Sequence, residues 1–432
     1  MSKPVLVTGA SGYVATRLIP ALLERGYKVR CLVRSPEKLK HRLWLQDVEI
    51  VTGDVLEAAT LQPAVSGIQT VFYLIHNMAS GKKYRDNERA GAIHFGRAAR
   101  ESGVENIIFL GGLGGSQKNR HMKSRQETGQ LLRESGVAVT EFRSSVILGS
   151  GSISFELIRF LATWLPVIPA PRQTFQPGQP IGIRDLLRYL LWAIDEPSCR
   201  GQIYEIGGPE VMAYPKLMQE FARRKGISRP LLPLPIFPIP FSARIADWLT
   251  PVPYAIAYPL MEELEAPSTV AKEEKVWERF SGTSKLSIKE SIAYAMDRQE
   301  YLPDSPWTSA ILPRQPLDKS HVTTSGDGFY IDYREISMDK ASSINFTVLM
   351  EKLPKDWKID IQKDREWIRL IQAKGLFGKL YLEIQLKNGK IMQSVFFDPS
   401  GIPGLLWWLV SRYYYLNKLN RFLAGSVDSP DS

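Results

Sequence analysis

The feature that most constrains the fold is a glycine turn between a short apolar strand and a helix at the start of the chain. Residues 5–7 read Val-Leu-Val, and the stretch that follows is Thr8-Gly9-Ala10-Ser11-Gly12-Tyr13-Val14. Gly9 can take the backbone angles of a tight turn, and Gly12 lets the main chain approach a bound group. The helix that begins near Tyr13 offers free N–H groups and a positive dipole end. This turn therefore predicts a site for a pyrophosphate.

A second apolar strand, residues 28–34, ends about 25 residues after Gly9, which is the spacing of a dinucleotide-binding βαβ unit. A carboxylate at the tip of that strand would bind the ribose 2′-hydroxyl of NAD. The chain instead has Arg34 and Ser35 there, with no acid before Glu37. We therefore predict NADP as the cofactor, with Arg34 contacting its 2′-phosphate, and NAD as the alternative. The other interpretation of Arg34 is a solvated strand end.

Apolar strands and helical stretches alternate through the first 150 residues. Further strands are expected at 48–55, 69–78, 107–110 and 138–143, and helices at 84–103 and 124–135. This alternation predicts an α/β fold with a Rossmann-type, doubly wound parallel sheet. Residues 151–300 are expected to form a small substrate subdomain, in which the proline-rich stretch 231–240 is an extended wall over the cleft.

The chain of 432 residues is too long for one ordinary domain. We expect one domain over 1–300, a proline-rich linker over 301–320, an α+β domain over 321–425 and a disordered tail over 426–432. Two cysteines make neither a disulfide framework nor a metal cluster, so we predict no metal site and a reducing compartment.

The net charge is +10, but the basic residues are interspersed with acids, so we predict no nucleic-acid partner. No apolar run reaches the roughly 18 residues of a spanning helix, and Met1-Ser2-Lys3 leads directly into the first strand. We therefore expect a cytoplasmic protein.

The chain resembles the extended and atypical short-chain dehydrogenase/reductases, in their NmrA-like branch. The matching stretches are 8–14, Gly53-Asp54, 72–76 and 143–149, and the resemblance continues through 179–186 and 204–209. It implies that Asp54 lies beside the adenine ring and Ile75-His76 beside the adenosine ribose. The cofactor-binding residues that we predict are Thr8, Gly9, Ser11, Gly12, Tyr13, Val14, Arg34, Asp54, Val55, Ile75, His76 and Gly111.

The catalytic positions differ from those of the family. Active members of the family use a Ser after the strand that corresponds to 107–110, and a Tyr-x-x-x-Lys on the next helix, where the Lys lowers the Tyr pKa. Here Gly111-Gly112 occupies the Ser position, and alignment puts His121 at the Tyr and Arg125 at the Lys. His121 has a pKa suited to proton transfer, and Arg125 could hold a ribose or an oxyanion.

Lys118 is a further catalytic candidate, because some atypical members of the family use a lysine as the acid–base group. The alternative is that His121 is an exposed residue of a polar loop, residues 117–124, with no chemical role.

Beyond residue 320 the sequence predicts short strands at 329–336, 344–350, 367–373, 380–386 and 391–397, some of them strictly alternating, and then an apolar helix at 405–423. This pattern resembles a polyketide-cyclase/START-like domain, on Phe397-Asp398-Pro399-Ser400-Gly401 and residues 404–408. The helix either packs its Trp and Leu face on the sheet or lies in a membrane interface. In the second case Trp407 and Trp408 would sit at headgroup depth, and Arg412 would face anionic lipid on the inner face of a membrane.

These observations favour an NADP-dependent reductase of an apolar carbonyl, quinone or enone. The absence of the usual Ser, Tyr and Lys favours a second hypothesis, a non-catalytic NADP(H)-sensing regulatory or assembly factor with a protein partner.

Overall fold

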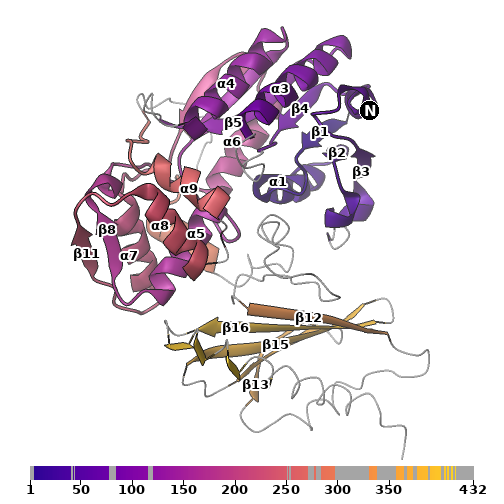
Figure 1. Cartoon of the computed structure of the whole chain (residues 1–432). Helices are drawn as coiled ribbons and strands as arrows, with labels where there is room; N and C mark the ends of the chain where they lie inside the picture. Colours follow the sequence, from indigo (N-terminus) through magenta and orange to yellow (C-terminus); the bar gives the residue numbers. More distant parts are fainter. Residues whose placement is uncertain are drawn as a thin grey trace, which may run out of the picture.

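The computed structural model describes most of the first 296 residues and parts of the remainder (Figure 1). The described residues are 4–39, 42, 44–76, 84–114, 120–250, 252, 254–270, 277–278, 284–296, 330–337, 357–363, 367–372, 377–387, 390–399, 403–404, 406–407, 410–411 and 414. The expected linker over 301–320 and the expected tail over 426–432 lie outside these residues, so both domain boundaries stay predictions.

A seven-stranded parallel sheet forms the centre of the N-terminal part. Its strands are β1 (Val5–Thr8), β2 (Val29–Val33), β3 (Glu49–Thr52), β4 (Thr70–Tyr73), β5 (Asn106–Gly112), β6 (Ala138–Ser144) and β10 (Ile203–Ile206). The strand order is β10-β6-β5-β4-β1-β2-β3. This order reverses direction between β1 and β4, and in such sheets ligands bind beyond the carboxyl ends of the strands at the reversal.

Helices cover both faces of this sheet. Successive side chains of each strand point to opposite faces, so one strand contributes apolar side chains to two cores. Val5 and Val7 belong to a core with α1 (Tyr13–Glu24) and α6 (Ile183–Asp195), whereas Leu6 belongs to a core with the helices of the other face. Those helices are α2 (Gln62–Val65), α3 (Tyr84–Glu101) and α4 (Arg120–Glu134). Figure 1 shows α3 and α4 side by side over the sheet. The predicted Rossmann-type, doubly wound sheet is confirmed.

A smaller subdomain is built from residues 147–182 and 207–296. Its helices are α5 (Ile153–Trp164), α7 (Tyr214–Arg224), α8 (Ile239–Leu249), α9 (Tyr254–Glu263) and α10 (Ile288–Met296). Two small parallel pairs join β7 (Ile147–Leu148) to β9 (Ile181–Gly182) and β8 (Ile168–Pro171) to β11 (Leu231–Leu234). Short 3-10 helices occur at Pro36–Leu39, Leu45–Asp47, Ala58–Thr60, Arg172–Phe175 and Pro197–Cys199.

The stretch 231–240 does not form the wall that we expected over the cleft. Residues 231–234 pair with β8, Ile236 is 73% exposed, and none of these residues lines either of the two cavities described below. The prolines exclude the stretch from the central sheet, as predicted, but they place it at an exposed edge of the subdomain.

The C-terminal part contains a five-stranded antiparallel sheet. Its strands are β12 (Tyr330–Ser337), β13 (Trp357–Lys363), β14 (Trp367–Gln372), β15 (Gly378–Lys387) and β16 (Lys390–Pro399), in the order β12-β16-β15-β14-β13. Sequence analysis missed β13, and the strand expected at 344–350 lies outside the described residues. The ring of Trp407, at a helical position, lies 5.3 Å from that of Phe397 and 5.9 Å from that of Phe377.

Helix α5 carries an ion pair in its buried face. Glu156 is fully buried and Arg159 is 4% exposed, and the Arg159 Nε donates a 2.5 Å hydrogen bond to Glu156 Oε2. The other carboxylate oxygen accepts 2.8 Å from the Gly151 N–H, and the Arg159 guanidinium lies 4.7 Å from the centre of the Phe160 ring. Glu156 thus pairs with a buried cation and also accepts a hydrogen bond from the turn that precedes α5.

We predict that Glu156→Ala lowers the free energy of unfolding by about 3–5 kcal/mol, because it leaves a buried guanidinium without its carboxylate. Urea unfolding followed by circular dichroism measures this. Glu101→Ala removes a carboxylate from the exposed Arg97–Glu101 pair of α3 and should leave the urea midpoint nearly unchanged. Equal midpoint shifts in the two variants would contradict the prediction.

Candidate functional site

A cavity of about 500 Å³ lies beyond the carboxyl ends of β1, β2, β4 and β5, at the reversal of the strand order. Of the residues predicted from the sequence, it is lined by Gly9, Ser11, Gly12, Tyr13, Val14, Arg34, Asp54, Val55, Ile75, His76, Gly111, His121 and Arg125. The fold therefore brings residues from six separate segments of the chain into one site. Lys118 lies outside the described residues.

The glycine turn has the geometry expected of a pyrophosphate cradle. Gly9 has φ +64°, and a Cβ built on it would lie 3.0 Å from the carbonyl oxygen of Leu74. Gly12 precedes the first turn of α1, and no side chain caps that turn. A Cβ on Gly12 would meet the carbonyl oxygen of Gly9 at 3.0 Å, so a side chain is excluded here as well. The uncapped N–H groups of α1 therefore face the cavity and suit a phosphate anion.

Thr8 has a structural position and does not line the cavity. Its side chain is fully buried, donates 3.2 Å to the carbonyl oxygen of Phe72 and accepts 3.2 Å from the N–H of Leu74. The hydroxyl thus bridges β1 and the end of β4. Thr8 therefore joins the glycine turn to the end of β4, and it does not line the cavity as a cofactor-binding residue would.

Arg34 stands at the mouth of the cavity with Ser35 and Lys38. Its side chain is 61% exposed, and one guanidinium nitrogen lies 3.8 Å from the Asp54 carboxylate. Asp54 is held in a tight turn, since its carboxylate accepts 3.0 Å from the N–H of Leu56. Two cations and a hydroxyl therefore surround the tip of β2, where a ribose 2′-substituent is bound in folds of this type.

The alternative interpretation of His121, an exposed loop residue, is wrong. Helix α4 begins at Arg120, several residues earlier than expected, and His121 is only 5% exposed. His121 and Arg125 are four residues apart on one helix, so they face the same side, and both line the cavity. They occupy the positions at which the resemblance places the Tyr and the Lys.

Arg125 is tied to the ends of two sheet strands. One guanidinium nitrogen donates 3.1 Å to the carbonyl oxygen of Ile75, and the other donates to that of Leu110. The guanidinium also lies 4.8 Å from the centre of the Phe109 ring and 3.7 Å from the Glu88 carboxylate. Its role is to place positive charge at the floor of the site while holding β4 and β5 together.

A buried carboxylate orients the two histidines. Glu88 on α3 is 3% exposed, accepts 2.7 Å from His76 Nδ1 and accepts 2.5 Å from the Ser124 hydroxyl. The other imidazole nitrogen of His76 lies 2.9 Å from His121 Nε2. Burial alone would raise the pKa of Glu88, but the bonds from His76 and Ser124 and the charge of Arg125 hold it well below its usual range.

His76 is held neutral. Burial is the largest cause and the nearby Arg125 charge the second, and together they lower the pKa of His76 to about 4 against the opposing pull of Glu88. A neutral imidazole that donates from Nδ1 to a carboxylate has its lone pair on Nε2. His76 Nε2 is therefore the acceptor for His121 Nε2–H.

Glu263, the last residue of α9, completes this group, and sequence analysis did not select it. Its Oε1 lies in close contact with His121 Nδ1. Glu88 had a sequence signal that we did not use: it shares one helical face with buried Gly91, Ala92 and Phe95, and an acid on an apolar face needs a partner. Glu263 has no such local signal, since it lies far from His121 along the chain.

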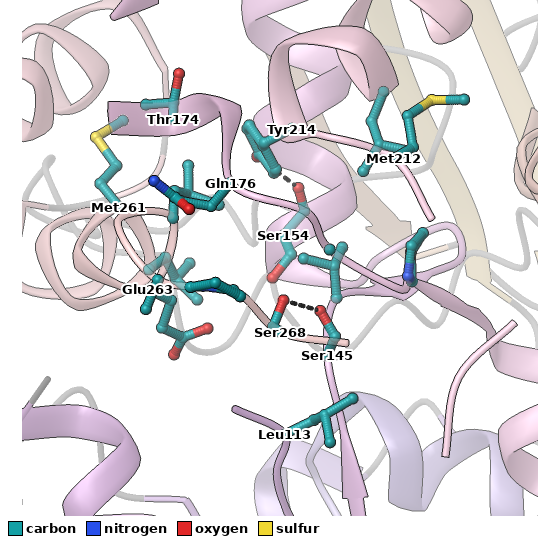
Figure 2. Close-up of a pocket in the computed structure, with 18 of the residues that line it drawn as sticks. Leu113, Ser145, Ser154, Thr174, Gln176, Met212, Tyr214, Met261, Glu263 and Ser268 are labelled. Atoms are coloured by element: carbon teal, nitrogen blue, oxygen red, sulfur yellow. Dashed lines mark hydrogen bonds between the residues drawn. The ribbon is translucent and has the colours of Figure 1, made fainter. Parts of the chain in front are cut away.

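A second cavity of about 60 Å³ adjoins the first on the side of the subdomain, and Glu263 is among the residues that line it. Figure 2 shows a hydrogen bond between the Ser145 and Ser268 hydroxyls (2.9 Å) and another from Tyr214 to the Ser154 carbonyl (3.1 Å). The residues that line both cavities are Met122, Ser144, Ser145, Ser154, Leu260 and Glu263. The two cavities thus meet at Glu263, beside His121, which lines the first cavity.

Comparison with known proteins agrees with this geometry. Residues 9–147 match the family model described as NAD(P)H-binding. A 3 beta-hydroxysteroid dehydrogenase/Delta 5→4-isomerase of Mycobacterium tuberculosis is 33% identical over 118 residues, which cover 26% of this chain and 30% of that protein. The photosystem II assembly factor Ycf39 of Cyanophora paradoxa is 29% identical over 151 residues, or 32% of this chain and 44% of that protein. The matches thus span less than half the length of these curated relatives.

Among solved structures, an NADPH-dependent quinone oxidoreductase of Escherichia coli, complexed with NADPH, is similar over 68% of this chain and 100% of its own. The TM-score is 0.55 and the identity 18%, a likeness that establishes the fold. The N-terminal part of the chain therefore has the fold of this oxidoreductase, and most of its first half matches the NAD(P)H-binding family model. Within the described residues, no helix combines the length and the apolar character needed to cross a membrane.

We predict that the protein loses stability as the pH falls from about 6.5 to about 4. In that window unfolded His76 binds a proton that folded His76 does not, so the free energy of unfolding rises with pH. Urea midpoints measured at half-unit pH steps test this. His76→Gln should flatten the slope in this window and leave the slope between pH 7 and pH 8.5 unchanged; an unaltered acid slope would contradict the assignment.

Proposed function

We propose that the protein is an NADP(H)-dependent reductase of a small apolar carbonyl, quinone or enone. The observation that carries the proposal is the continuity of the site: the cavity that starts at the glycine turn reaches His121 and Glu263 and there meets a second cavity. A dinucleotide laid along the carboxyl ends of the strands would end at this junction.

The residues present fit such a cofactor. The N–H groups at the start of α1 and the bare backbone of Gly9 and Gly12 would hold its pyrophosphate. The Arg34 side chain would hold a 2′-phosphate. When bound, NADPH would supply a hydride. The protein's own task is then to orient a substrate and to give it a proton.

The lining of the second cavity supports an apolar substrate. Met122, Leu157, Met212, Leu217 and Met261 supply apolar surface. The polar side chains that line it include the hydroxyls of Ser145, Ser154, Thr174 and Ser268, which suit one or two oxygen atoms of a ligand, and the carboxyl group of Glu263. No lysine, arginine or aspartate lines this cavity in the described part of the chain, which disfavours a strongly charged substrate.

The acid in this proposal is His121. It takes the position of the missing Tyr, and it is fixed by His76 on one side and by Glu263 on the other. A histidine held between two partners has the orientation that proton transfer requires, which an exposed loop histidine lacks.

The preference for NADP over NAD is tested at Arg34. We expect Arg34→Glu to raise the dissociation constant of NADPH by about 10- to 100-fold, because it replaces an attraction to the 2′-phosphate with a repulsion, and to change that of NADH less than about threefold. Fluorescence titration of the purified protein measures both constants.

Arg97→Glu is the matched control, because Arg97 is exposed on α3 and does not line the cavity. Equal loss of NADPH and NADH binding in Arg34→Glu would show that the arginine does not read the phosphate.

Turnover is tested with a panel of quinones, enones and apolar aldehydes and ketones. We expect saturable NADPH oxidation with at least one compound, and His121→Asn should lower kcat about 100-fold or more with little change in NADPH affinity. His94→Asn is the control, because His94 bonds the carbonyl oxygen of Val55 and lines neither cavity. Tight NADPH binding by the wild-type protein with no turnover across the panel would defeat the proposal.

The second candidate function is a non-catalytic NADP(H)-sensing regulatory or assembly factor. The observations that favour it are Gly111-Gly112 at the position of the usual Ser, the use of Arg125 donors by main-chain carbonyls, and the similarity to an assembly factor. In this case NADPH and NADP⁺ should differ in promoting a pull-down of a protein partner. Equal capture of a partner with NADPH and with NADP⁺ would contradict this second candidate function.

For the C-terminal part we propose a START-like domain that presents or covers the substrate, in a cytoplasmic protein. The antiparallel sheet with Trp407 packed on it supports this arrangement. Contact of the C-terminal helix with the inner face of a membrane is the alternative, and sedimentation with vesicles of anionic lipid distinguishes the two.

A further inference from the structure

We propose that Glu263 and His121 share one proton and together form the acid of the site, with Glu263 as a catalytic residue. This inference rests on the proposed reductase function and adds a residue from the subdomain to its chemistry. It follows from counting hydrogens along a chain of four side chains contributed by four different segments: Glu88 on α3, His76 after β4, His121 on α4 and Glu263 on α9.

The direction of the chain is set at its buried end. Glu88 is a carboxylate, since it accepts from Ser124 and lies near Arg125, so the hydrogen between Glu88 and His76 belongs to His76 Nδ1. His76 is neutral, so its Nε2 carries no hydrogen. The hydrogen in the 2.9 Å contact between the two imidazoles therefore belongs to His121 Nε2.

The proton count at the other end then requires one more hydrogen. His121 Nδ1 and Glu263 Oε1 are buried atoms in contact, and in the described part of the chain neither atom is in a hydrogen bond. If His121 were the neutral Nε2–H form and Glu263 a carboxylate, two lone pairs would face each other in a buried contact. One proton must lie between them, either on Nδ1 as an imidazolium or on Oε1 as a carboxylic acid.

This proton lies where a substrate would need it. Glu263 lines both cavities and its side chain is 23% exposed, whereas His121 is 6% exposed and faces the cofactor cavity. The charged and titratable groups around the pair are His76, Glu88 and Arg125, and the Tyr84 ring lies 6.5 Å from that of His121. Glu263 lines the second cavity, whereas His121 and the surrounding His76, Glu88 and Arg125 do not.

The transfer balances as a reduction. When the substrate carbonyl carbon has accepted a hydride, its oxygen is an alkoxide, and a new O–H bond forms with the shared proton as the bond of that proton to the pair breaks. The pair is left as neutral His121 and carboxylate Glu263, in mutual repulsion, and takes up a proton from water to return to its starting form. The repulsion between the two lone pairs favours reprotonation, so water restores the starting form of the pair without another acidic side chain.

The first experiment needs no substrate. In protein labelled with ¹⁵N in the histidine side chains, at pH 7, we expect His121 in the wild type to show a proton shared at Nδ1. In Glu263→Gln we expect an unprotonated Nδ1 and a retained Nε2–H. Glu262→Gln, the neighbouring carboxylate on α9 that lines neither cavity, should give the wild-type spectrum. An unprotonated Nδ1 in the wild type would overturn the inference.

The second experiment uses the compound from the panel that wild-type protein reduces fastest. We expect Glu263→Gln to lower kcat at least tenfold and to alter the pH profile of kcat, while the dissociation constant of NADPH changes less than twofold. Glu262→Gln should change neither. Full activity in Glu263→Gln would remove Glu263 from the chemistry and leave the reductase proposal standing. A wild-type protein without turnover would defeat the reductase proposal itself, even with the shared proton present.

Discussion

The close approach of the β1–α1 turn to the end of β4 is the constraint on which the site depends. Gly9 packs its backbone against the main chain of Leu74, at a distance that a side chain could not occupy. The Thr8 hydroxyl fixes the same two segments with a hydrogen bond in each direction. As a result, Ile75 and His76 emerge directly beside the glycine turn, and one cavity holds both a phosphate cradle and a histidine.

A chain of side-chain contacts leads from Glu88 through His76 and His121 to Glu263. Glu88 sets the tautomer of His76, His76 sets that of His121, and His121 then presents a defined nitrogen to Glu263. The first link depends on the burial of Glu88, because a solvated carboxylate would exchange its hydrogen bonds with water. A single carboxylate on α3 therefore determines the proposed proton arrangement at the edge of the second cavity.

Much of this site could be predicted from the sequence, and the reason is local spacing. The glycine turn, the strand that ends at Arg34 and the His121–Arg125 pair are each defined by residues close together in the chain, and all of them line the cavity. Even so, the sequence placed the start of α4 too late. A run of polar residues near 117–124 has little apolar periodicity, and burial of His121 against His76 and Glu263 is a tertiary effect.

Glu263 could not be predicted for the same reason. Only the fold of the subdomain brings the end of α9 over α4, and no spacing along the chain records that contact. The proline-rich stretch 231–240 shows the reverse case: its composition correctly excluded a central strand, but composition does not say which side of a subdomain a segment will occupy.

The position of Glu263 at the end of α9 has a consequence for how the two halves of this part of the chain work together. The nitrogen and the oxygen that hold the proton belong to different structural units, the Rossmann-type sheet layer and the smaller subdomain. A displacement of α9 that widened the entrance for an incoming molecule would also pull the carboxylate away from the imidazole. The proposed acid therefore depends on the packing of α9 against α4, so it couples the chemistry of the site to the contact between the two units.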